Sequence, residues 1–306
     1  MNEGSGVSWP VKTRELHTHH FNSTRWNDFR FRDGDIVIAT YAKSGTTWTQ
    51  QIISQLLFGG REGINVHQLS PWVDLRILPP EALAGLDHQS HRRFVKTHLP
   101  LDALKFSPQA KYIYIGRDGR DTVWSFHNHH YNATDEYFRV YNEGRPAGLP
   151  LLERGTPDPA EFYRAWMEHN GYPIWPFWEH IRSWWAARHL PNVMLVHFND
   201  LKADLDGSIR RIAAFLEIPV DEANWPDIVN HCSFDYMKGH ASEVAPRGGI
   251  MWQGGGATFI NKGTNGRWRD ALSPQEIAAY EAKALAELGP DCARWLAKGG
   301  GVKAAG

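Results

Sequence analysis

The segment "YAKSGTTW" at residues 41–48 sets a lysine, a serine, a glycine and two threonines side by side, directly after the apolar run "DIVIAT" at 35–40. Where a strand passes into a helix through such a turn, free backbone N–H groups, hydroxyls and an ammonium group can all point at one place. The composition therefore predicts an anion site. The alternative is an ordinary strand-to-helix turn in which Thr46 caps the helix.

The order of these residues differs from the phosphate-binding loop of kinases and NTPases, G-x-x-x-x-G-K-[ST], because Lys43 comes before the glycine. Such enzymes also need an aspartate after a second strand to hold Mg²⁺. Asp118 follows the apolar run at 111–116, but it lies between Arg117 and Arg120 and can equally begin a helix. A nucleotide-dependent kinase therefore stays as the weaker alternative.

The elements that position these residues are short, continuous apolar runs, which are typical of strands buried on both faces of a parallel sheet. The runs cover residues 35–40, 111–116 and 192–198, with a weaker one at 92–98. Helix-like segments follow at 46–58, 119–131 and 199–217. This alternation predicts an α/β fold with a central parallel sheet and crossover helices.

The remaining segments are less regular. A long loop rich in glycine and proline is predicted between 132 and 160, aromatic-rich helices at 161–189, irregular chain at 247–266, and an amphipathic helix at about 273–297. No repeat or linker divides the chain.

We therefore expect one domain over 1–306, with an N-terminal segment at 1–30 and a flexible tail at 298–306.

Composition excludes several classes of protein. The chain has 306 residues, of which 42% are hydrophobic, and a formal net charge of −1, so nothing global indicates a nucleic-acid or anionic-membrane partner. Two cysteines do not make a disulfide framework, and the first residues lack the basic and apolar regions of a signal peptide. No apolar run approaches the ~20 residues of a membrane span. We expect a soluble, cytoplasmic globular protein.

The segment at 41–48 closely resembles the 5′-phosphosulfate loop of the cytosolic sulfotransferases, usually Y-P-K-S-G-T-T-W. These enzymes move a sulfonate group from 3′-phosphoadenosine-5′-phosphosulfate (PAPS) to an alcohol, phenol or amine, leaving adenosine 3′,5′-bisphosphate (PAP). Further segments resemble family motifs in the family's order: "KTHLP" (96–100), "RDGRDTVWS" (117–125), "HFNDLKADL" (197–205), "HCSFDYMK" (231–238) and "NKGTNGRW" (261–268).

The resemblance implies a three-layer α/β fold related to P-loop kinases, with a central parallel sheet flanked by helices, and PAPS as co-substrate without a metal. It assigns the phosphosulfate to Lys43 with Ser44, Gly45, Thr46, Thr47 and Trp48. Lys43 would neutralise the leaving phosphate oxygen, which in a kinase is a task of Mg²⁺.

The same resemblance makes His98 the general base, which takes the proton of the acceptor hydroxyl. Lys96, two residues earlier on the same strand face, would reach the sulfonate oxygens. Arg117 and Ser125 would bind the 3′-phosphate, and the family serine also engages the catalytic lysine. For Arg117, the alternative is a structural ion pair with Asp121.

Trp48 and Phe198 fall where the family holds adenine between two rings, and the other nucleotide-binding positions are Cys232, Asn261, Lys262 and Gly263. Some of these positions depart from the family. Phe198 replaces a tyrosine, Cys232 a threonine and Asn261 an arginine, while Ala42 replaces the loop proline. Arg247 and Arg267 are two candidates to compensate for the missing arginine. The family's C-terminal dimer motif is not evident, so we expect a monomer or a homodimer that does not use it.

Two histidine clusters, "HTHH" (17–20) and "FHNHH" (126–130), lack the spacing of a specific metal site. Because His127, His129 and His130 follow Ser125, we expect some of them to line the acceptor pocket, together with Trp72 and the loop at 132–160.

The resulting interpretation is a sulfotransferase acting on a hydroxyl or amine of a small apolar acceptor. A non-catalytic relative that only binds the nucleotide is the second alternative.

Overall fold

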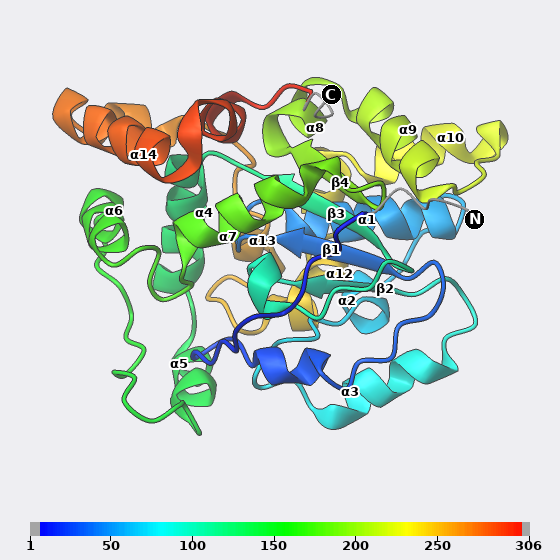
Figure 1. Cartoon of the computed structure of the whole chain (residues 1–306), viewed down its shortest axis with the longest axis horizontal. Coiled ribbons are helices and arrows are strands. Elements are labelled where there is room, and N and C mark those ends of the chain that lie inside the picture. Colours follow the sequence, from blue (N-terminus) through cyan, green and yellow to red (C-terminus); the bar gives the residue numbers. More distant parts are fainter. Residues whose placement is uncertain (1–6, 302–306) are drawn as a thin grey trace.

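The computed structural model describes residues 7–301 and contains a four-stranded sheet with the order β2-β1-β3-β4 (Figure 1). The strands are β1 (Ile36–Thr40), β2 (Phe94–Thr97), β3 (Lys111–Gly116) and β4 (Val193–His197). β1 pairs in parallel with β2 and β3, and β3 pairs in parallel with β4. All four predicted strands and their parallel arrangement are confirmed.

Alternate residues of the strands enter two separate hydrophobic cores, one on each face of the sheet. Ile36 and Ile38 pack into one core, whereas Val37 and Ala39 pack into the other. The first core is closed by α1 (Thr46–Leu57), α9 (Leu205–Leu216) and α10 (Trp225–His231). The second is closed by α4 (Gly119–Tyr131), α6 (Pro159–Glu168), α7 (Phe177–Ala186) and α14 (Pro274–Lys298). The predicted three-layer α/β fold is therefore confirmed.

The helices differ from the predicted pattern in two segments of the chain. The segment expected as a loop at 132–160 contains α5 (Asp135–Asn142), because the Thr134 side chain accepts a hydrogen bond from the backbone N–H of Tyr137 and caps a helix start. The single helix expected at 199–217 is two helices, α8 (Phe198–Ala203) and α9. Asp204 separates them and caps α9 by accepting from the backbone N–H of Gly207.

The other predicted segments keep their general character. α14 begins with a capping box between Ser273 and Glu276 and bends at Gly289. The glycine-rich segment at 247–266 is mostly irregular and holds only the short α13 (Gly256–Phe259) and part of a 3₁₀ helix. Residues 1–6 and 302–306, parts of the predicted N-terminal segment and tail, lie outside the described residues. One domain over the whole chain stays a prediction.

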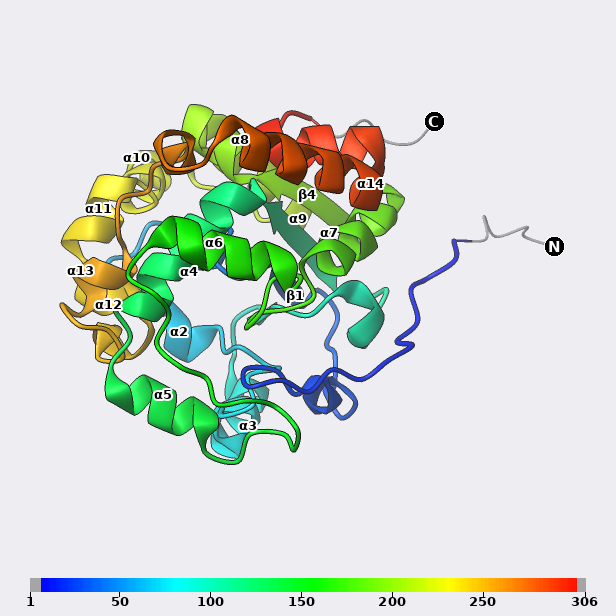
Figure 2. The ribbon, with the colours of Figure 1, turned by 90° about the vertical axis from the view of Figure 1, so that its left-hand side faces the viewer.

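The remaining helices are short. They are α2 (Val66–Leu69), α3 (Pro80–Ala84), α11 (Phe234–Gly239) and α12 (Ala241–Val244), with 3₁₀ helices at Ser23–Trp26, Gly85–His88, Leu101–Ala103, Ala187–His189, Glu222–Asn224, Pro246–Gly249 and Arg267–Asp270. Figures 1 and 2 show α3 and α5 at the opposite end of the molecule from α8 and α14. Among the described helices, none is long and apolar enough to cross a membrane.

The parallel sheet places four residues of the predicted site at one edge. β1 runs into the loop with Lys43, and β2, β3 and β4 end directly before His98, Arg117 and Phe198. Because the carboxyl ends of parallel strands meet at the same edge, side chains far apart in the sequence converge there.

Candidate active site

A continuous cavity of about 600 Å³ opens at the carboxyl edge of the sheet. Most of the predicted site residues line it, namely Lys43, Gly45, Thr46, Thr47, Trp48, Lys96, His98, Arg117, Ser125, Phe198, Asn261, Lys262 and Gly263. Ser44 and Cys232 do not line it.

The loop between β1 and α1 contains positive φ angles, which few residue types adopt without strain. Gly45 is the N-cap of α1 with φ of 119°, and a Cβ there would come within 3.2 Å of Phe198 Cδ2. Lys43 also has a positive φ, of 69°. The alternative in which Thr46 caps the helix is wrong, because Gly45 occupies that position and the Thr46 hydroxyl lies 2.6 Å from the hydroxyl of Thr40.

The ammonium group of Lys43 is held by residues of two distant segments. Its Nζ donates to Nδ1 of His129, 3.2 Å away on α4, and lies 4.4 Å from the centroid of the Phe259 ring. Burial, together with the charges of Arg117 and Lys96, lowers the pKa of Lys43 to about 7. The polar partner of this lysine is therefore His129 rather than the expected Ser125.

His98 is fixed in one tautomer by the end of β1. Its Nδ1 lies 2.8 Å from the carbonyl oxygen of Thr40, which can only accept, so Nδ1 carries the proton and Nε2 keeps its lone pair. The Trp72 ring packs against it edge-on at 4.6 Å. Burial and the charge of Lys96 lower the pKa of His98 to about 3, so the ring is neutral near pH 7.

Lys96 lies on β2 with its ammonium inside the cavity. Its Nζ donates to Oε1 of Gln50 at 3.3 Å and to Nδ1 of His67 at 3.4 Å. His67 can accept there because its Nε2 donates to the carbonyl oxygen of Val244. Burial lowers the pKa of Lys96 to about 8, and the carboxylate of Asp74 partly opposes this. Lys96 thus has neutral hydrogen-bond partners and keeps an excess positive charge.

Arg117 has a neutral partner as well. Its Nε and Nη2 donate to Oδ1 of Asn265 at 3.1 and 2.7 Å, and its Nη1 donates to the carbonyl oxygen of Lys43 at 3.0 Å. Asn265 is held in turn by Asn199, whose Oδ1 accepts at 2.6 Å. Among the described residues, Arg117 forms no ion pair, so the structural pairing with Asp121 is wrong. Asp121 instead accepts from the backbone N–H of Gly266.

The two aromatic rings predicted to hold adenine touch each other. The centroids of Trp48 and Phe198 are 5.3 Å apart and the ring planes are inclined by 71°, so the rings do not form two parallel faces. The guanidinium of Arg117 lies 4.1 Å from the centroid of Phe198. A base stacked here contacts these rings from the cavity side.

Two predicted nucleotide-binding side chains are elsewhere. Cys232 is fully buried at the C-terminal end of α10, and its carbonyl oxygen accepts from Nε1 of Trp48 at 2.7 Å. Burial raises the pKa of its thiol, so the side chain stays uncharged. Ser44 is buried in the turn, where its backbone N–H donates to the carbonyl oxygen of Tyr41. The prediction that the Cys232 side chain contacts the nucleotide is therefore not supported by its position; Cys232 instead orients Trp48.

The segment at 261–265 lines the cavity with its first four residues. In the described part of the chain, none of its N–H groups donates a hydrogen bond. Gly263 has φ of 62°, and a Cβ there would lie 2.6 Å from Cε2 of Phe234, so only glycine fits. Lys202 fastens the segment by donating to the carbonyl oxygen of Gly263 at 2.8 Å. Successive free N–H groups of this kind favour an anion.

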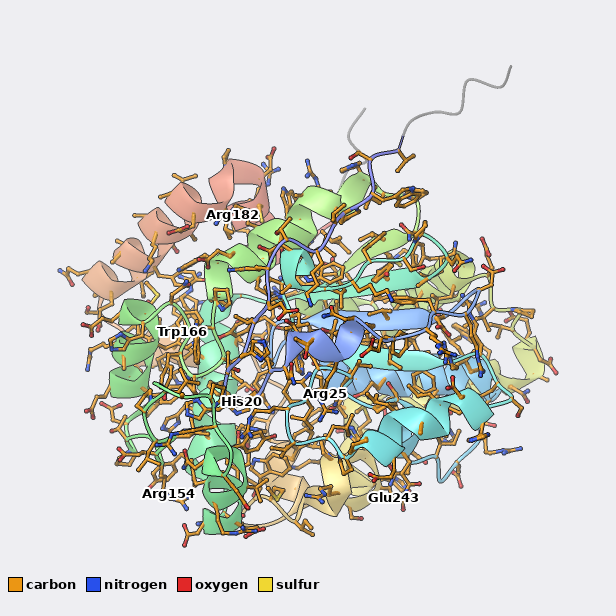
Figure 3. All side chains as sticks on the ribbon, turned by 60° about the horizontal axis from the view of Figure 1, so that its bottom comes forward. His20, Arg25, Arg154, Trp166, Arg182 and Glu243 are labelled. Atoms are coloured by element: carbon orange, nitrogen blue, oxygen red, sulfur yellow. The ribbon has the colours of Figure 1, made fainter. Side chains whose placement is uncertain are left out.

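The other end of the cavity is largely apolar. It is lined by Trp72, Leu75, Ile77, Leu78, Tyr137, Val140, Tyr141, Met251 and Trp252. His20 joins them through a 3.0 Å hydrogen bond between its Nε2 and the hydroxyl of Tyr137. Figure 3 shows His20 in the interior of the molecule, while Arg154 lies toward its outside. This end suits an apolar body rather than a second nucleotide.

Of the three histidines after Ser125, only His129 lines the cavity. His127 and His130 instead donate from Nε2 to the carbonyl oxygens of Thr156 and Glu153, which fastens the glycine-rich loop to α4. Within residues 7–301 no group of three histidine, cysteine, aspartate or glutamate side chains is arranged to hold a metal ion.

Several contacts of the site were not predicted from the sequence. Thr40 orients His98, Gln50 and His67 hold Lys96, and Asn265 holds Arg117. Two of these four residues had some indication in the sequence: Thr40 ends a predicted strand, and Asn265 lies inside a recognised motif.

A family model described as "Sulfotransferase domain" matches residues 33–288. The chain belongs to the sulfotransferase family. It is 34% identical to a "Glycolipid sulfotransferase" of Mycobacterium bovis (strain BCG / Pasteur 1173P2), over 91% of this chain and 92% of the relative. It is 28% identical to "Sulfotransferase 1B1" of Mus musculus, over 87% of each chain.

Solved structures agree with this sulfotransferase fold. A mouse sulfotransferase, SULT7A1, solved with PAP, has a TM-score of 0.69 at 24% identity and covers 90% of this chain and 92% of its own. Retinol dehydratase in a complex with retinol and PAP has a TM-score of 0.64 at 25% identity, over 87% and 84%. At the level of the family, the prediction of a PAPS-dependent sulfotransferase is confirmed.

Proposed function

We propose that this sulfotransferase transfers the sulfonate group of PAPS to a hydroxyl group carried by an apolar acceptor. One observation carries the proposal above others: burial and the charge of Lys96 keep the His98 ring neutral, and its bond to Thr40 leaves Nε2 unprotonated in the cavity, beside Trp72 of the apolar end. A fixed neutral imidazole at that point is what proton removal from an acceptor requires.

The cationic end matches the phosphates and sulfonate of PAPS. Lys43, Lys96, Arg117, Lys202 and Lys262 all line the cavity, although the whole chain has a formal net charge of −1. The three buried cations have neutral hydrogen-bond partners, so their charge remains available to a ligand. Burial depresses the pKa values of both Lys43 and Lys96, and the charges of Arg117 and Lys96 depress that of Lys43 further. An anion bound between the two lysines therefore stabilises their charged forms.

The residues act together in one displacement. His98 Nε2 takes the proton of the acceptor hydroxyl while that oxygen forms a bond to sulfur. The bond between sulfur and the bridging phosphate oxygen breaks, and Lys43 neutralises the charge that develops on the departing oxygen. Lys96 contacts the sulfonate oxygens of PAPS. The products are a sulfate ester and PAP, with the proton left on His98.

The apolar end supports an acceptor in which a hydroxyl is attached to a hydrophobic body. Aromatic and aliphatic side chains from the β2 side, α5 and the segment after Pro246 make up its wall. Two similar proteins support an apolar acceptor: one relative is a glycolipid sulfotransferase, and retinol dehydratase was solved with retinol. We therefore place alcohols on lipid or other apolar bodies ahead of small polar alcohols and amines.

A specific contact argues against the kinase alternative. Asp118, the aspartate that would hold Mg²⁺, pairs with Arg120 at 2.7 Å and caps α4 through the backbone N–H of Arg120 at 2.8 Å. Both of its oxygens are thus engaged, so we propose transfer without a metal. The presence of Lys43 and His98 in one cavity argues equally against a non-catalytic nucleotide binder.

We further propose that the enzyme works in the cytoplasm as a monomer, or as a homodimer formed without the family's usual motif. Its two cysteines, Cys232 and Cys292, are both free and buried, which suits a reducing compartment.

A panel of acceptors with PAPS tests the proposal directly. Sterols, long-chain alcohols, glycolipids, phenols and amines are incubated with enzyme, PAPS and EDTA, and products are detected by mass. We expect sulfated products from the apolar alcohols. Products formed only with ATP and Mg²⁺ would contradict the proposal, as would transfer confined to small polar acceptors.

A further inference from the structure

The family arginine that joins Lys262 and Gly263 at the 3′-phosphate is absent, because Asn261 stands in its position. The asparagine lines the cavity but carries no charge. Two arginines nearby in the sequence, Arg247 and Arg267, also line the cavity, and the sequence does not distinguish between them. The structure separates them.

Arg247 belongs to the acceptor end. It lies in the 3₁₀ helix Pro246–Gly249 with φ of 51°. The segment after it is tied to the start of α5, because the carbonyl oxygen of Met251 accepts from the backbone N–H of Thr134. On α5, the charge of Arg247 adds to the effect of Arg139 in lowering the pKa of Glu136, and it partly offsets the burial that raises the pKa of Tyr141. α5 forms the wall of the apolar end, so Arg247 is at the wrong end of the cavity to meet the nucleotide's ribose phosphate.

Arg267 belongs to the nucleotide end. It begins the 3₁₀ helix Arg267–Asp270, and the preceding Gly266 is fastened to α4 by donation from its backbone N–H to Asp121 Oδ1 at 2.6 Å. The charge of Arg267 acts on Arg117 after β3 and on His127, two residues beyond Ser125 on α4. The 3₁₀ helix that Arg267 begins also packs against α4, so Arg267 lies at the end of the cavity that holds Arg117.

The guanidinium N–H groups of Arg267 are available to a ligand. The side chain is partly buried, lines the cavity, and within residues 7–301 forms no hydrogen bond or ion pair. Burial lowers its pKa, and the nearby carboxylate of Asp121 partly offsets this. Among the described residues no ion pair joins Arg267 to Asp121, whose Oδ1 accepts from the backbone N–H of Gly266. A guanidinium brought into a cavity without a partner costs free energy unless an anion meets it.

We propose that Arg267 is a specificity-determining ligand of the 3′-phosphate of PAPS and PAP, in place of the arginine that the family carries at position 261. It completes an anion site with Arg117, Ser125, Lys262 and the free backbone N–H groups at 261–265. A phosphate monoester carries about −1.5 to −2 charges at neutral pH, which two guanidinium groups and a lysine balance even with Asp121 nearby. This proposal rests on the proposed function, because it assumes that the nucleotide carries a 3′-phosphate.

The test compares two ligands that differ by that phosphate. PAP binding is measured directly by calorimetry, and binding of adenosine 5′-monophosphate is measured by competition with PAP, for wild type, Arg267→Gln and the matched control Arg247→Gln. We expect Arg267→Gln to weaken PAP binding by about tenfold or more while changing adenosine 5′-monophosphate binding by less than about twofold. Arg267→Lys should restore part of the loss, and Arg247→Gln should change neither ligand.

The outcomes separate this inference from the proposed function. PAP binding by Arg267→Gln within about twofold of wild type would overturn the inference and leave the proposed function intact. An equal loss for both ligands would overturn it too, because the arginine would then act on the fold or the adenosine. A larger loss in Arg247→Gln than in Arg267→Gln would do the same. Failure of wild type to bind PAP at all would overturn the proposed function together with the inference.

Discussion

Nδ1 of His98 lies 2.8 Å from the carbonyl oxygen of Thr40, so one backbone atom at the end of β1 sets the tautomer of a side chain at the end of β2. β1 and β2 are hydrogen-bonded neighbours with Ala39 opposite Thr97, and this register brings the two strand ends together. The same β1 end continues into the loop that carries Lys43. A single strand pair therefore positions both the proposed base and the cation proposed to stabilise the leaving group.

Replacing Lys43 by alanine should impair both nucleotide binding and the chemical step, since its charge is worth more as the leaving oxygen becomes anionic. We expect kcat to fall by about 10²–10³-fold, with a smaller loss of PAP affinity. Steady-state and single-turnover rates with PAPS measure the two effects. The matched control is His129→Asn, which keeps an acceptor for the ammonium and should lose far less. Rescue of Lys43→Ala by Mg²⁺ would instead support the kinase alternative.

Nucleotide affinity should fall as the pH rises above neutrality. In the protein alone, the pKa of Lys43 is about 7 and that of Lys96 about 8, mainly because both are buried. An anion beside them raises both pKa values, so binding takes up protons between pH 7 and the raised values, and affinity declines there by up to about tenfold per proton per pH unit. Calorimetry with PAP at pH 7, 8 and 9 measures this. In Lys43→Met the dependence should be shallower by up to one proton; an equally steep decline there would contradict the assignment.

Replacing Asn265 by aspartate should weaken PAP binding. Asn265 now holds Arg117 through a neutral oxygen at 2.7 Å, and a carboxylate in its place would neutralise the guanidinium charge. We expect a loss of about tenfold in PAP affinity, larger than that of Asn265→Ala, which removes the contact without adding charge. Calorimetry on both variants decides the question: a greater loss in the alanine variant would show that positioning, not charge, is what Asn265 contributes.

Nucleotide should order the segment at 247–266, and the structure predicts where. The backbone N–H of Gln253 already donates to the carbonyl oxygen of Asn132, whereas the N–H groups of 261–265 have no partner in the described chain. Hydrogen exchange with and without PAP should therefore change most at 261–265 and little at 251–253. β1 provides an internal control. Equal exchange at 261–265 in both conditions would mean that this segment does not close on the nucleotide.

The strand ends and four of the site residues could be predicted from the sequence, because these four follow the end of an apolar strand within three positions. Parallel pairing then determines that Lys43, His98, Arg117 and Phe198 meet, whatever the details of packing. Position along a motif does not determine which way a side chain points. Cys232 has a nucleotide-binding position in the family pattern, yet its side chain packs into the core and only its carbonyl oxygen reaches Trp48.

Contacts between distant loops likewise could not be predicted from the sequence. The bond from Lys43 to His129 depends on the distance between the β1 loop and the third turn of α4, and no local pattern encodes that distance. The same is true of Asn265 and Asn199, which meet because the segment at 261–265 folds over the start of α8. The choice between Arg247 and Arg267 needed the structure for this reason.

We propose that His98, kept neutral by burial and oriented by Thr40, takes the acceptor proton in metal-free sulfonate transfer from PAPS. The most direct measurement is the rate of transfer of radiolabelled sulfonate from PAPS to an accepted alcohol in EDTA, for wild type and His98→Gln, with PAP affinity measured on both proteins. The account predicts full wild-type activity in EDTA and a kcat about 10²–10⁴-fold lower in the variant, with PAP affinity nearly unchanged. Turnover of His98→Gln within about threefold of wild type, or a wild-type requirement for metal, would contradict it.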